Sequence, residues 1–169
     1  MTSSQKRIAI CPGSFDPITL GHLNIIRRSA QIFDEVVVCV MHNATKTSPM
    51  FTVEERGDMV RRAVIRYPNV HVETADILIA EFAKRFEHAV LVKGLRAASD
   101  FDYEFQMNLV NKRINPDLET MFLTASEKYT FLSSSVVREM AKYQADLTGR
   151  VPSELIPDIE EKARTWRKN

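Results

Sequence analysis

A histidine and several small residues follow the first apolar stretch of the chain. Residues 7–10 are typical of a strand, and residues 23–33 carry apolar side chains at helical spacing. Gly13 and the pair Gly21-His22 lie in the junction between them. Free backbone N–H groups and the positive end of the helix dipole make such a junction an anion site and disfavour protonation of a histidine there. A neutral His22 could therefore donate one hydrogen bond to a phosphate oxygen.

A simpler interpretation of this junction is open as well. Gly13 could only permit a turn, Pro17 could only stiffen it, and His22 could face solvent in the first turn of the helix. The phosphate interpretation is favoured by the joint occurrence of Ser14, Phe15-Asp16-Pro17 and Gly21-His22 within one strand-to-helix junction.

Three cationic residues follow expected strands and could neutralise phosphate charge. Lys46 lies in the polar loop after the second strand, and Lys93 and Arg96 flank a Gly-Leu pair after the fourth. Each could equally be a solvated surface residue. Their places at the carboxyl ends of strands favour phosphate contacts, for which lysine serves as a mobile point charge and arginine as a fork.

The run Ser133-Ser134-Ser135 opens another expected helix. One serine is enough to cap that helix, and capping is the conservative interpretation. Three hydroxyls together with free backbone N–H groups could also hold triphosphate oxygens. Glu104, on the helix after Arg96, is an ordinary solvated acid in the simplest interpretation.

Five strands must alternate with helices to bring these residues together. That alternation predicts an α/β protein with a Rossmann-like open parallel sheet, right-handed crossovers and helices on both faces. With the strand order 3-2-1-4-5, a ligand would lie beyond the carboxyl ends of the first and fourth strands, where the order reverses. The expected strands are residues 7–10, 35–41, 70–73, 89–92 and 120–124, and the expected helices are residues 23–33, about 52–67, 77–86, 100–114, 136–144 and 152–167.

Length and composition favour one domain that binds a small ligand. The chain has 169 residues, of which 44% are hydrophobic, and 23 Lys and Arg against 22 Asp and Glu give a net charge of +1. We therefore expect a single domain over residues 1–169 and no nucleic-acid partner. No apolar run approaches the roughly 20 residues that span a bilayer, and the polar start lacks a signal-peptide core. We expect a cytoplasmic protein with no membrane partner.

The two cysteines, Cys11 and Cys39, fall in or beside expected buried strands. Neither belongs to a Cys-x-x-Cys pair, and histidines are not clustered, so we expect small core residues and no metal site formed by side chains.

Two segments together resemble the nucleotidyltransferase superfamily. They are Thr19-Leu20-Gly21-His22 near the first helix and Tyr129-Thr130-Phe131-Leu132-Ser133-Ser134-Ser135 near the fifth. The wider set is similar to the bacterial phosphopantetheine adenylyltransferase family over nearly the whole chain. It adds Pro12-Gly13-Ser14-Phe15-Asp16-Pro17, Phe51-Thr52-Val53-Glu54-Glu55-Arg56, Gly94-Leu95-Arg96 and Asp100-Phe101-x-Tyr103-Glu104.

The resemblance implies reversible transfer of AMP from ATP to 4'-phosphopantetheine, which gives dephospho-coenzyme A and pyrophosphate in coenzyme A biosynthesis. It implies a homohexamer and Mg²⁺ that balances pyrophosphate charge. His22 would stabilise the transition state, with Lys46 and Arg96 as further catalytic residues. The acceptor would contact Ser14, Lys46, Ile79, Lys93 and Asn111. ATP would contact Ser14, Phe15, His22, Gly94, Leu95, Arg96, Glu104, Tyr129, Thr130, Phe131, Leu132, Ser133, Ser134 and Ser135.

Three positions depart from the usual family pattern but keep its chemistry. Ser14 stands where many relatives have threonine, Lys93 where arginine also occurs, and Ile79 where methionine or leucine is common. No histidine, serine or cysteine is accompanied by a recognisable base for covalent catalysis. We therefore expect direct in-line attack by the acceptor phosphate, with catalysis through positioning and charge neutralisation.

Three other functions remain open at this point. Nicotinate mononucleotide adenylyltransferases share the first segment and a related second one, although Gly94-Leu95-Arg96 and Asp100-Phe101-x-Tyr103-Glu104 speak against them. A non-catalytic ATP-binding module would use the same loops without transfer, and release of pyrophosphate would exclude it. A fragment of a class I tRNA synthetase would have little basic surface with which to bind tRNA.

Overall fold

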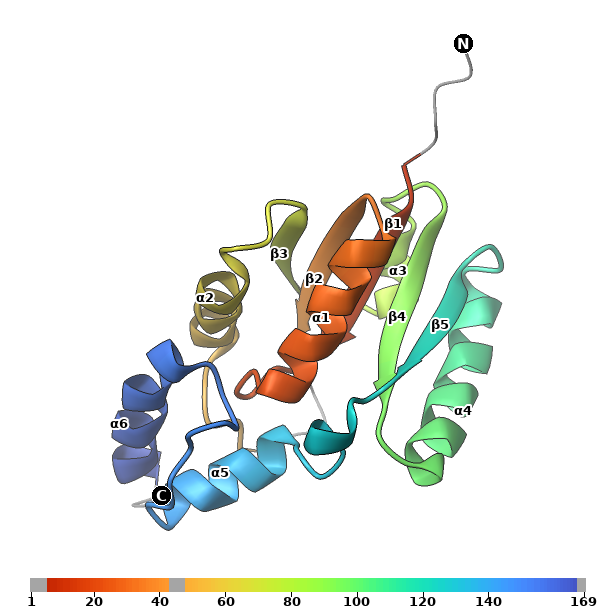
Figure 1. Ribbon diagram of the computed structural model, residues 1–169. Coiled ribbons are helices and arrows are strands. Elements are labelled where there is room, and N and C mark those ends of the chain that lie inside the picture. The colour runs from red at the N-terminus through yellow and green to blue at the C-terminus, as the bar shows by residue number, and fades with distance from the viewer. Residues whose placement is uncertain (1–5, 43–47, 167–169) are drawn as a thin grey trace.

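A parallel five-stranded sheet forms the centre of the computed structural model, which describes residues 6–42 and 48–166 (Figure 1). Its order is β3-β2-β1-β4-β5, and every neighbouring pair is parallel. The predicted fold class and strand order are confirmed. The strands are β1 (Ile8–Gly13), β2 (Glu35–Met41), β3 (Val70–Ala75), β4 (Ala89–Leu95) and β5 (Glu119–Thr124).

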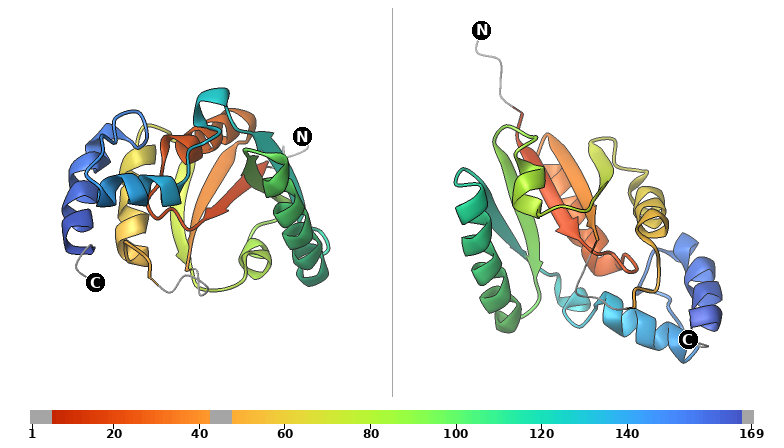
Figure 2. Two further views of the ribbon diagram at one scale, coloured as in Figure 1. Left: turned by 90° about the horizontal axis from the view of Figure 1, so that it is seen from below. Right: turned by 180° about the vertical axis from the view of Figure 1, so that it is seen from behind.

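The central strands are apolar on both faces because helices cover both sides of the sheet. Val36, Val38 and Val40 of β2 face the larger core, while Val37 and Cys39 face the smaller one. Helices α1 (Leu20–Ile32), α2 (Val53–Val64), α5 (Ser134–Lys142) and α6 (Ile156–Trp166) contribute to the larger core. The smaller core lies under α3 (Ile79–Ala83) and the end of α4 (Ala98–Ile114), as seen from behind in Figure 2.

Strands β1 and β4 separate before they end. Their pairing covers only three residue pairs, up to Ile10 with Leu91. Beyond this point β1 continues alongside β2 to Gly13, and β4 continues alongside β5 to Leu95. A crevice therefore opens between the two strands on either side of the point where the strand order reverses, as the order 3-2-1-4-5 predicts.

Several predicted boundaries differ from the observed ones. The fourth strand does not end at Val92 but continues through Lys93 and Gly94 to Leu95, because these residues pair with β5. The third helix is shorter than predicted and covers only Ile79–Ala83. The predicted helix start at Thr52 is confirmed, since its side chain accepts from the backbone N–H of Glu55 and the Glu55 carboxylate accepts from that of Thr52.

Both cysteines are buried core residues, as predicted. Burial raises the pKa of each thiol to about 12. Cysteine chemistry at neutral pH is therefore disfavoured, because a thiolate is the reactive form.

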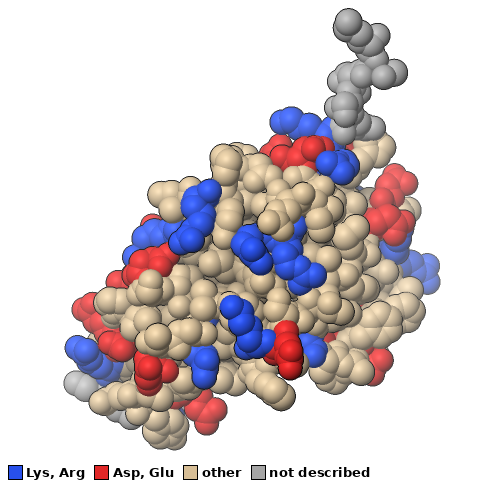
Figure 3. All heavy atoms as spheres, in the orientation of Figure 1, with Lys and Arg blue, Asp and Glu red and all other residues tan. Residues whose placement is uncertain are grey.

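Charged side chains of both signs are interspersed over the face in Figure 3, where several basic groups lie over α1. Among the helices in the described ranges, none is long and apolar enough to cross a membrane.

Candidate active site

The crevice at the carboxyl ends of β1 and β4 contains a cavity of about 480 Å³. Its walls come from those two strands and from the first turns of α1, α4 and α5, which converge in the lower part of Figure 1. This volume suits a small-molecule ligand with several polar groups.

The imidazole of His22 has its orientation set by the cap of α1. The Thr19 backbone N–H donates to His22 Nδ1 at 3.1 Å, and the Thr19 hydroxyl lies 3.0 Å from the same nitrogen. Because a backbone N–H can only donate, we assign Nδ1 as an acceptor and place the proton of the neutral ring on Nε2. The Nε2–H tautomer is the one required for hydrogen-bond donation through this nitrogen.

Phe15 forms an unusual turn beside that histidine. Its ring meets the His22 ring edge-on, with 5.2 Å between centroids, and its φ is 47°. Such a left-handed backbone is uncommon for a bulky residue and points to a turn held by its surroundings. A side chain at Gly13 would not fit the same turn, since a Cβ there would lie 2.9 Å from the Phe15 ring.

Two cations of the cavity wall are held by acids of α4. Arg96 forms a fork with Asp100, with Nε and Nη2 at 3.1 and 3.2 Å from its two oxygens. Lys93 Nζ lies 3.1 Å from Glu104, and the side chains of this pair are only 25% and 19% exposed. The acids fix the two cations at the cavity and leave a local charge balance near zero.

Asp100 stays ionised in this arrangement. Partial burial alone would raise the pKa of its carboxyl, but the hydrogen bonds and charge of Arg96 outweigh that effect and hold the pKa below its usual range. The fork therefore persists at neutral pH and orients the guanidinium of Arg96.

The three serines at the start of α5 have different partners. Ser133 caps the helix by accepting from the Val136 N–H at 3.2 Å, as the conservative interpretation predicts. Ser134 instead donates to the carbonyl of Pro17 at 2.8 Å, and Ser135 accepts from Arg138 at 3.2 Å. All three line the cavity, so capping accounts for only the first of them.

The cavity brings together most of the predicted ATP contacts. Its lining includes Phe15, His22, Gly94, Arg96, Glu104, Tyr129, Leu132, Ser133, Ser134 and Ser135, together with Lys93, which was predicted to contact the acceptor. Glu104 is therefore an ion-paired cavity residue and not the solvated acid of the simplest interpretation.

Several other predicted residues that the structure describes do not line this cavity. Phe131 is 91% exposed, and Asn111 is buried within α4. Lys46 lies outside the described residues. Ser14, Ile79, Leu95 and Thr130 are also absent from the described cavity lining.

Sequence reasoning missed two features of the site. Asp100 follows Arg96 by four residues, and this spacing on one helix start could have indicated an ion pair. The second feature is the buried network around the Asp16 carboxylate, whose partners are far away in the sequence although Asp16 itself lies in a recognised segment. No local pattern could have found it.

Fold and site together define an α/β nucleotidyltransferase, with a phosphate-suited histidine and paired cations at the point where the strand order reverses. A family model described as cytidylyltransferase-like matches residues 10–140. Curated proteins named phosphopantetheine adenylyltransferase match at greater length. The one from Clostridium tetani is 47% identical over 92% of this chain and 97% of its own length. The one from Caldanaerobacter subterraneus is 48% identical over 90% and 92%. This chain therefore belongs to the phosphopantetheine adenylyltransferase family.

A solved structure supports the fold independently. It is described as a putative nicotinate-nucleotide adenylyltransferase from Vibrio parahaemolyticus and matches with a TM-score of 0.64 over 98% of both chains. Since the two sequences are only 17% identical, the likeness shows a shared fold and does not indicate a shared acceptor.

Proposed function

We propose that this protein transfers AMP from ATP to 4'-phosphopantetheine and releases dephospho-coenzyme A and pyrophosphate. Family membership supports the substrates. The observation that carries the proposal for this chain is the cavity in which His22, Lys93, Arg96 and the start of α5 meet. We place the reaction in the cytoplasm, where ATP and coenzyme A precursors are available.

The reaction would proceed by one in-line displacement. An oxygen of the acceptor phosphate attacks the α-phosphorus of ATP, and the bond from that phosphorus to the bridging oxygen breaks. The electron pair leaves with pyrophosphate. No general base is required, because the attacking phosphate oxygen already carries negative charge, and catalysis rests on positioning and charge stabilisation.

His22 would act on the α-phosphate through its Nε2–H. The Thr19 N–H occupies Nδ1 and orients the ring. A hydrogen bond aimed at the oxygens that gain charge in the transition state is worth more there than in the ground state. His22 therefore serves as the transition-state stabiliser in this proposal.

The remaining ATP contacts would come from the opposite walls. Arg96, oriented by Asp100, and the free backbone N–H groups at the start of α5 would hold the phosphates. The Gly94 wall lies close to α1, since a Cβ at this position would approach Ile25 to 3.0 Å. A side chain at this position would crowd Ile25, so glycine lets β4 and α1 pack closely at the cavity wall.

The acceptor would reach the reaction from the side of α3 and α4. Lys93 and Ser14 would meet its phosphate, together with Lys46. Ile79 of α3 and the buried Asn111 of α4 would contact the pantetheine arm. The two helices adjoin, because Asn115 donates to the carbonyl of Ala80 at 3.3 Å.

Mg²⁺ would enter with ATP. The described residues include no group of three or more His, Cys, Asp or Glu side chains that could hold a metal ion. The ion therefore fits best on phosphate oxygens and water, which are the ligands it prefers. Bound there, it would neutralise the charge that develops on pyrophosphate.

We also propose that the protein works as a homo-oligomer, and as a homohexamer by resemblance to its family. Phe101, Phe105 and Leu109 form a stripe along α4 at four-residue spacing, and each is more than 40% exposed. An exposed apolar stripe of this kind is typical of a surface that another chain covers.

One experiment tests the reaction and the choice of acceptor together. The protein is incubated with ATP, Mg²⁺ and either 4'-phosphopantetheine, nicotinate mononucleotide or no acceptor, and the products are identified by mass. We expect dephospho-coenzyme A and an equal amount of pyrophosphate only with 4'-phosphopantetheine. Adenylylation of nicotinate mononucleotide instead, or nucleotide binding with no product, would contradict the proposal.

A further inference from the structure

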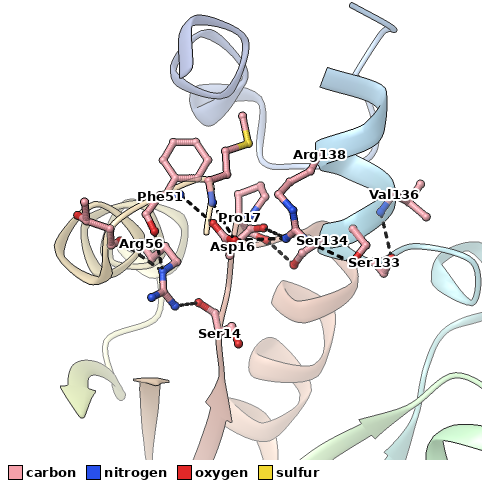
Figure 4. Close-up of polar contacts among 12 residues, drawn as sticks. Ser14, Asp16, Pro17, Phe51, Arg56, Ser133, Ser134, Val136 and Arg138 are labelled. Atoms are coloured by element: carbon pink, nitrogen blue, oxygen red, sulfur yellow. Dashed lines mark hydrogen bonds and ion pairs between the residues drawn. The ribbon is translucent and has the colours of Figure 1, made fainter. Parts of the chain in front are cut away.

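The carboxylate of Asp16 lies at the centre of a buried polar network next to the cavity (Figure 4). It is 1% exposed. Its oxygens accept from the backbone N–H groups of Met50 and Phe51, at 3.2 and 3.0 Å, and from the Arg138 guanidinium at 3.3 Å. A buried carboxylate with charge-assisted bonds of this kind fixes its surroundings more firmly than an exposed one.

These bonds join three segments of the site. Asp16 itself lies in the loop after β1, which also carries Ser14 and Phe15. Met50 and Phe51 lead into α2. Arg138 comes from α5, where its guanidinium also donates to Ser135 and to the backbone carbonyl of Asp16.

Arg56 of α2 holds the same loop from the opposite side (Figure 4). Its side chain is buried and donates to the carbonyls of Ser14, Met41 and Phe51. The loop after β1 is therefore clamped between α2 and α5. The left-handed backbone of Phe15 lies between these two anchors.

None of these side chains needs to touch a substrate to affect the reaction. In the proposed function, the nucleotide's phosphates rest on the start of α5 and on His22, while the acceptor's phosphate rests on Ser14 and Lys93. Ser14 lies in the loop after β1 and the nucleotide-side serines lie at the start of α5, so the separation of these two contacts depends on what joins the loop to α5. The carboxylate of Asp16 bonds the loop after β1 to both of the other segments.

We propose that Asp16 and Arg138 are positioning residues that set the distance between the nucleotide and the acceptor phosphate. The inference rests on the proposed function. Loosening the pair would remove no side chain that contacts the acceptor and, on the nucleotide side, only the support of Ser135, but it would misalign the attacking oxygen and the α-phosphorus. A displacement of about 1 Å can lower turnover on the order of 10²-fold.

The test compares Asp16→Asn, Arg138→Ala and Arg138→Lys with the wild-type enzyme. Turnover is followed by pyrophosphate release, and the dissociation constant of each substrate alone is measured by calorimetry. We expect kcat to fall on the order of 10²-fold in Asp16→Asn and Arg138→Ala, with dissociation constants within about threefold of wild type. Added guanidinium should restore part of the turnover of Arg138→Ala. The kcat of Arg138→Lys should fall less than that of Arg138→Ala.

Asp34→Asn is the matched control. Asp34 also accepts from a backbone N–H and a guanidinium, both of Arg7, but it lies at the other end of the sheet and is exposed. Its substitution should leave kcat unchanged. If Asp16→Asn does not fold, Arg138→Ala and its rescue by guanidinium decide the question.

Two results would overturn the positioning role. One is a folded Arg138→Ala enzyme with wild-type kcat. The other is a loss that appears entirely as weaker binding of one substrate, with kcat unchanged, which would make the pair part of a single binding site. Failure of the proposed function is separate, since the wild-type enzyme would then form no dephospho-coenzyme A.

Discussion

At the scale of single residues, His22 depends on a cap as much as on its own side chain. The Thr19 hydroxyl accepts a hydrogen bond from the backbone N–H of His22, and the backbone N–H of Thr19 donates to Nδ1 of the imidazole. The reciprocal pair places the ring at the start of α1, where the helix dipole and free N–H groups favour an anion. The capping box normally uses glutamate or glutamine at this position, and here it uses the histidine that we propose as a phosphate contact.

Removing this imidazole should separate catalysis from folding. We expect His22→Ala to fold with a loss of about 1 kcal/mol from the weakened cap, and to lose on the order of 10²-fold or more in kcat. The control is His71→Ala, which removes an exposed histidine from β3 and should leave kcat unchanged. Single-turnover rates in the two variants give the comparison, and near-normal turnover in His22→Ala would exclude a transition-state role.

The cysteines give a second prediction at this scale. With a pKa of about 12, each thiol is only on the order of one part in 10⁴ ionised at about pH 8. We therefore expect a disulfide reagent such as Ellman's to release no colour from the native protein and to titrate both cysteines after denaturation. Rapid labelling of the native protein would mean that Cys11, beside the cavity, opens to solvent.

Single residues also show how far the sequence can predict the site. His22 and Arg96 could be recognised because their motifs are contiguous and each belongs to one local turn. The role of Asp16 could not be, since its partners Phe51 and Arg138 are 35 and 122 residues away. Such a role depends on packing between elements that no short pattern encodes.

At the scale of elements, the crevice arises from unequal strand pairing. The type and order of the strands could be predicted because buried parallel strands are continuously apolar. The point where β1 and β4 part, after Ile10 and Leu91, could not be predicted, and neither could the continued pairing of β4 with β5 as far as Leu95. The pairing with β5 makes Lys93 a strand residue, so the pleat of the strand sets the direction of its side chain. The sequence instead predicts that Lys93 lies in a loop.

Helix α6 is joined to α2 by an ion pair that responds to acid. Lys162 lies 2.7 and 2.9 Å from the two oxygens of Glu55. Partial burial alone would raise the pKa of this carboxyl, but Lys162 and the Thr52 N–H outweigh it and lower the pKa below its ordinary value of 4.5. A lowered pKa in the folded state stabilises the fold above the ordinary value, and this contribution is lost as pH falls through the lowered value.

Replacing Lys162 should therefore lower the free energy of unfolding near neutral pH but have little effect on it in acid. At about pH 6 we expect Lys162→Met to lower the free energy of unfolding by at most about 1 kcal/mol, since both side chains are partly exposed. At about pH 3 the difference in free energy of unfolding between the variant and the wild type should become smaller. Urea unfolding at the two pH values measures it, and a gap of the same size at both would show that packing, not charge, accounts for the effect.

At the scale of the whole molecule, one helix, α4, carries both cavity residues and the exposed apolar stripe. The first two turns of α4 supply Asp100 and Glu104 to the site. The same helix carries the exposed stripe of Phe101, Phe105 and Leu109 beside the edge strand β5 (Figure 1). A chain that covers this stripe would also steady the helix that orients Arg96 and Lys93, so assembly and activity should be coupled.

Leu109→Glu tests that coupling without touching the cavity, because the stripe residue is 53% exposed and does not line it. We expect the wild-type protein to have a mass several times the 19.3 kDa of one chain, six times if the family assembly holds. The variant should be smaller, because a charge buried at an interface is strongly disfavoured. Its kcat should fall with its mass.

The matched control is Ile65→Glu, which places the same charge on an exposed apolar position at the end of α2. It should change neither mass nor kcat. Size-exclusion chromatography with light scattering measures the mass, and a single-chain mass for the wild-type protein would contradict the proposed assembly. A Leu109→Glu protein of lower mass with full activity would instead show that catalysis does not depend on assembly. In that case the contacts of α4 within one chain, chiefly the Arg96–Asp100 fork and the Lys93–Glu104 pair, would be enough to hold the helix in place.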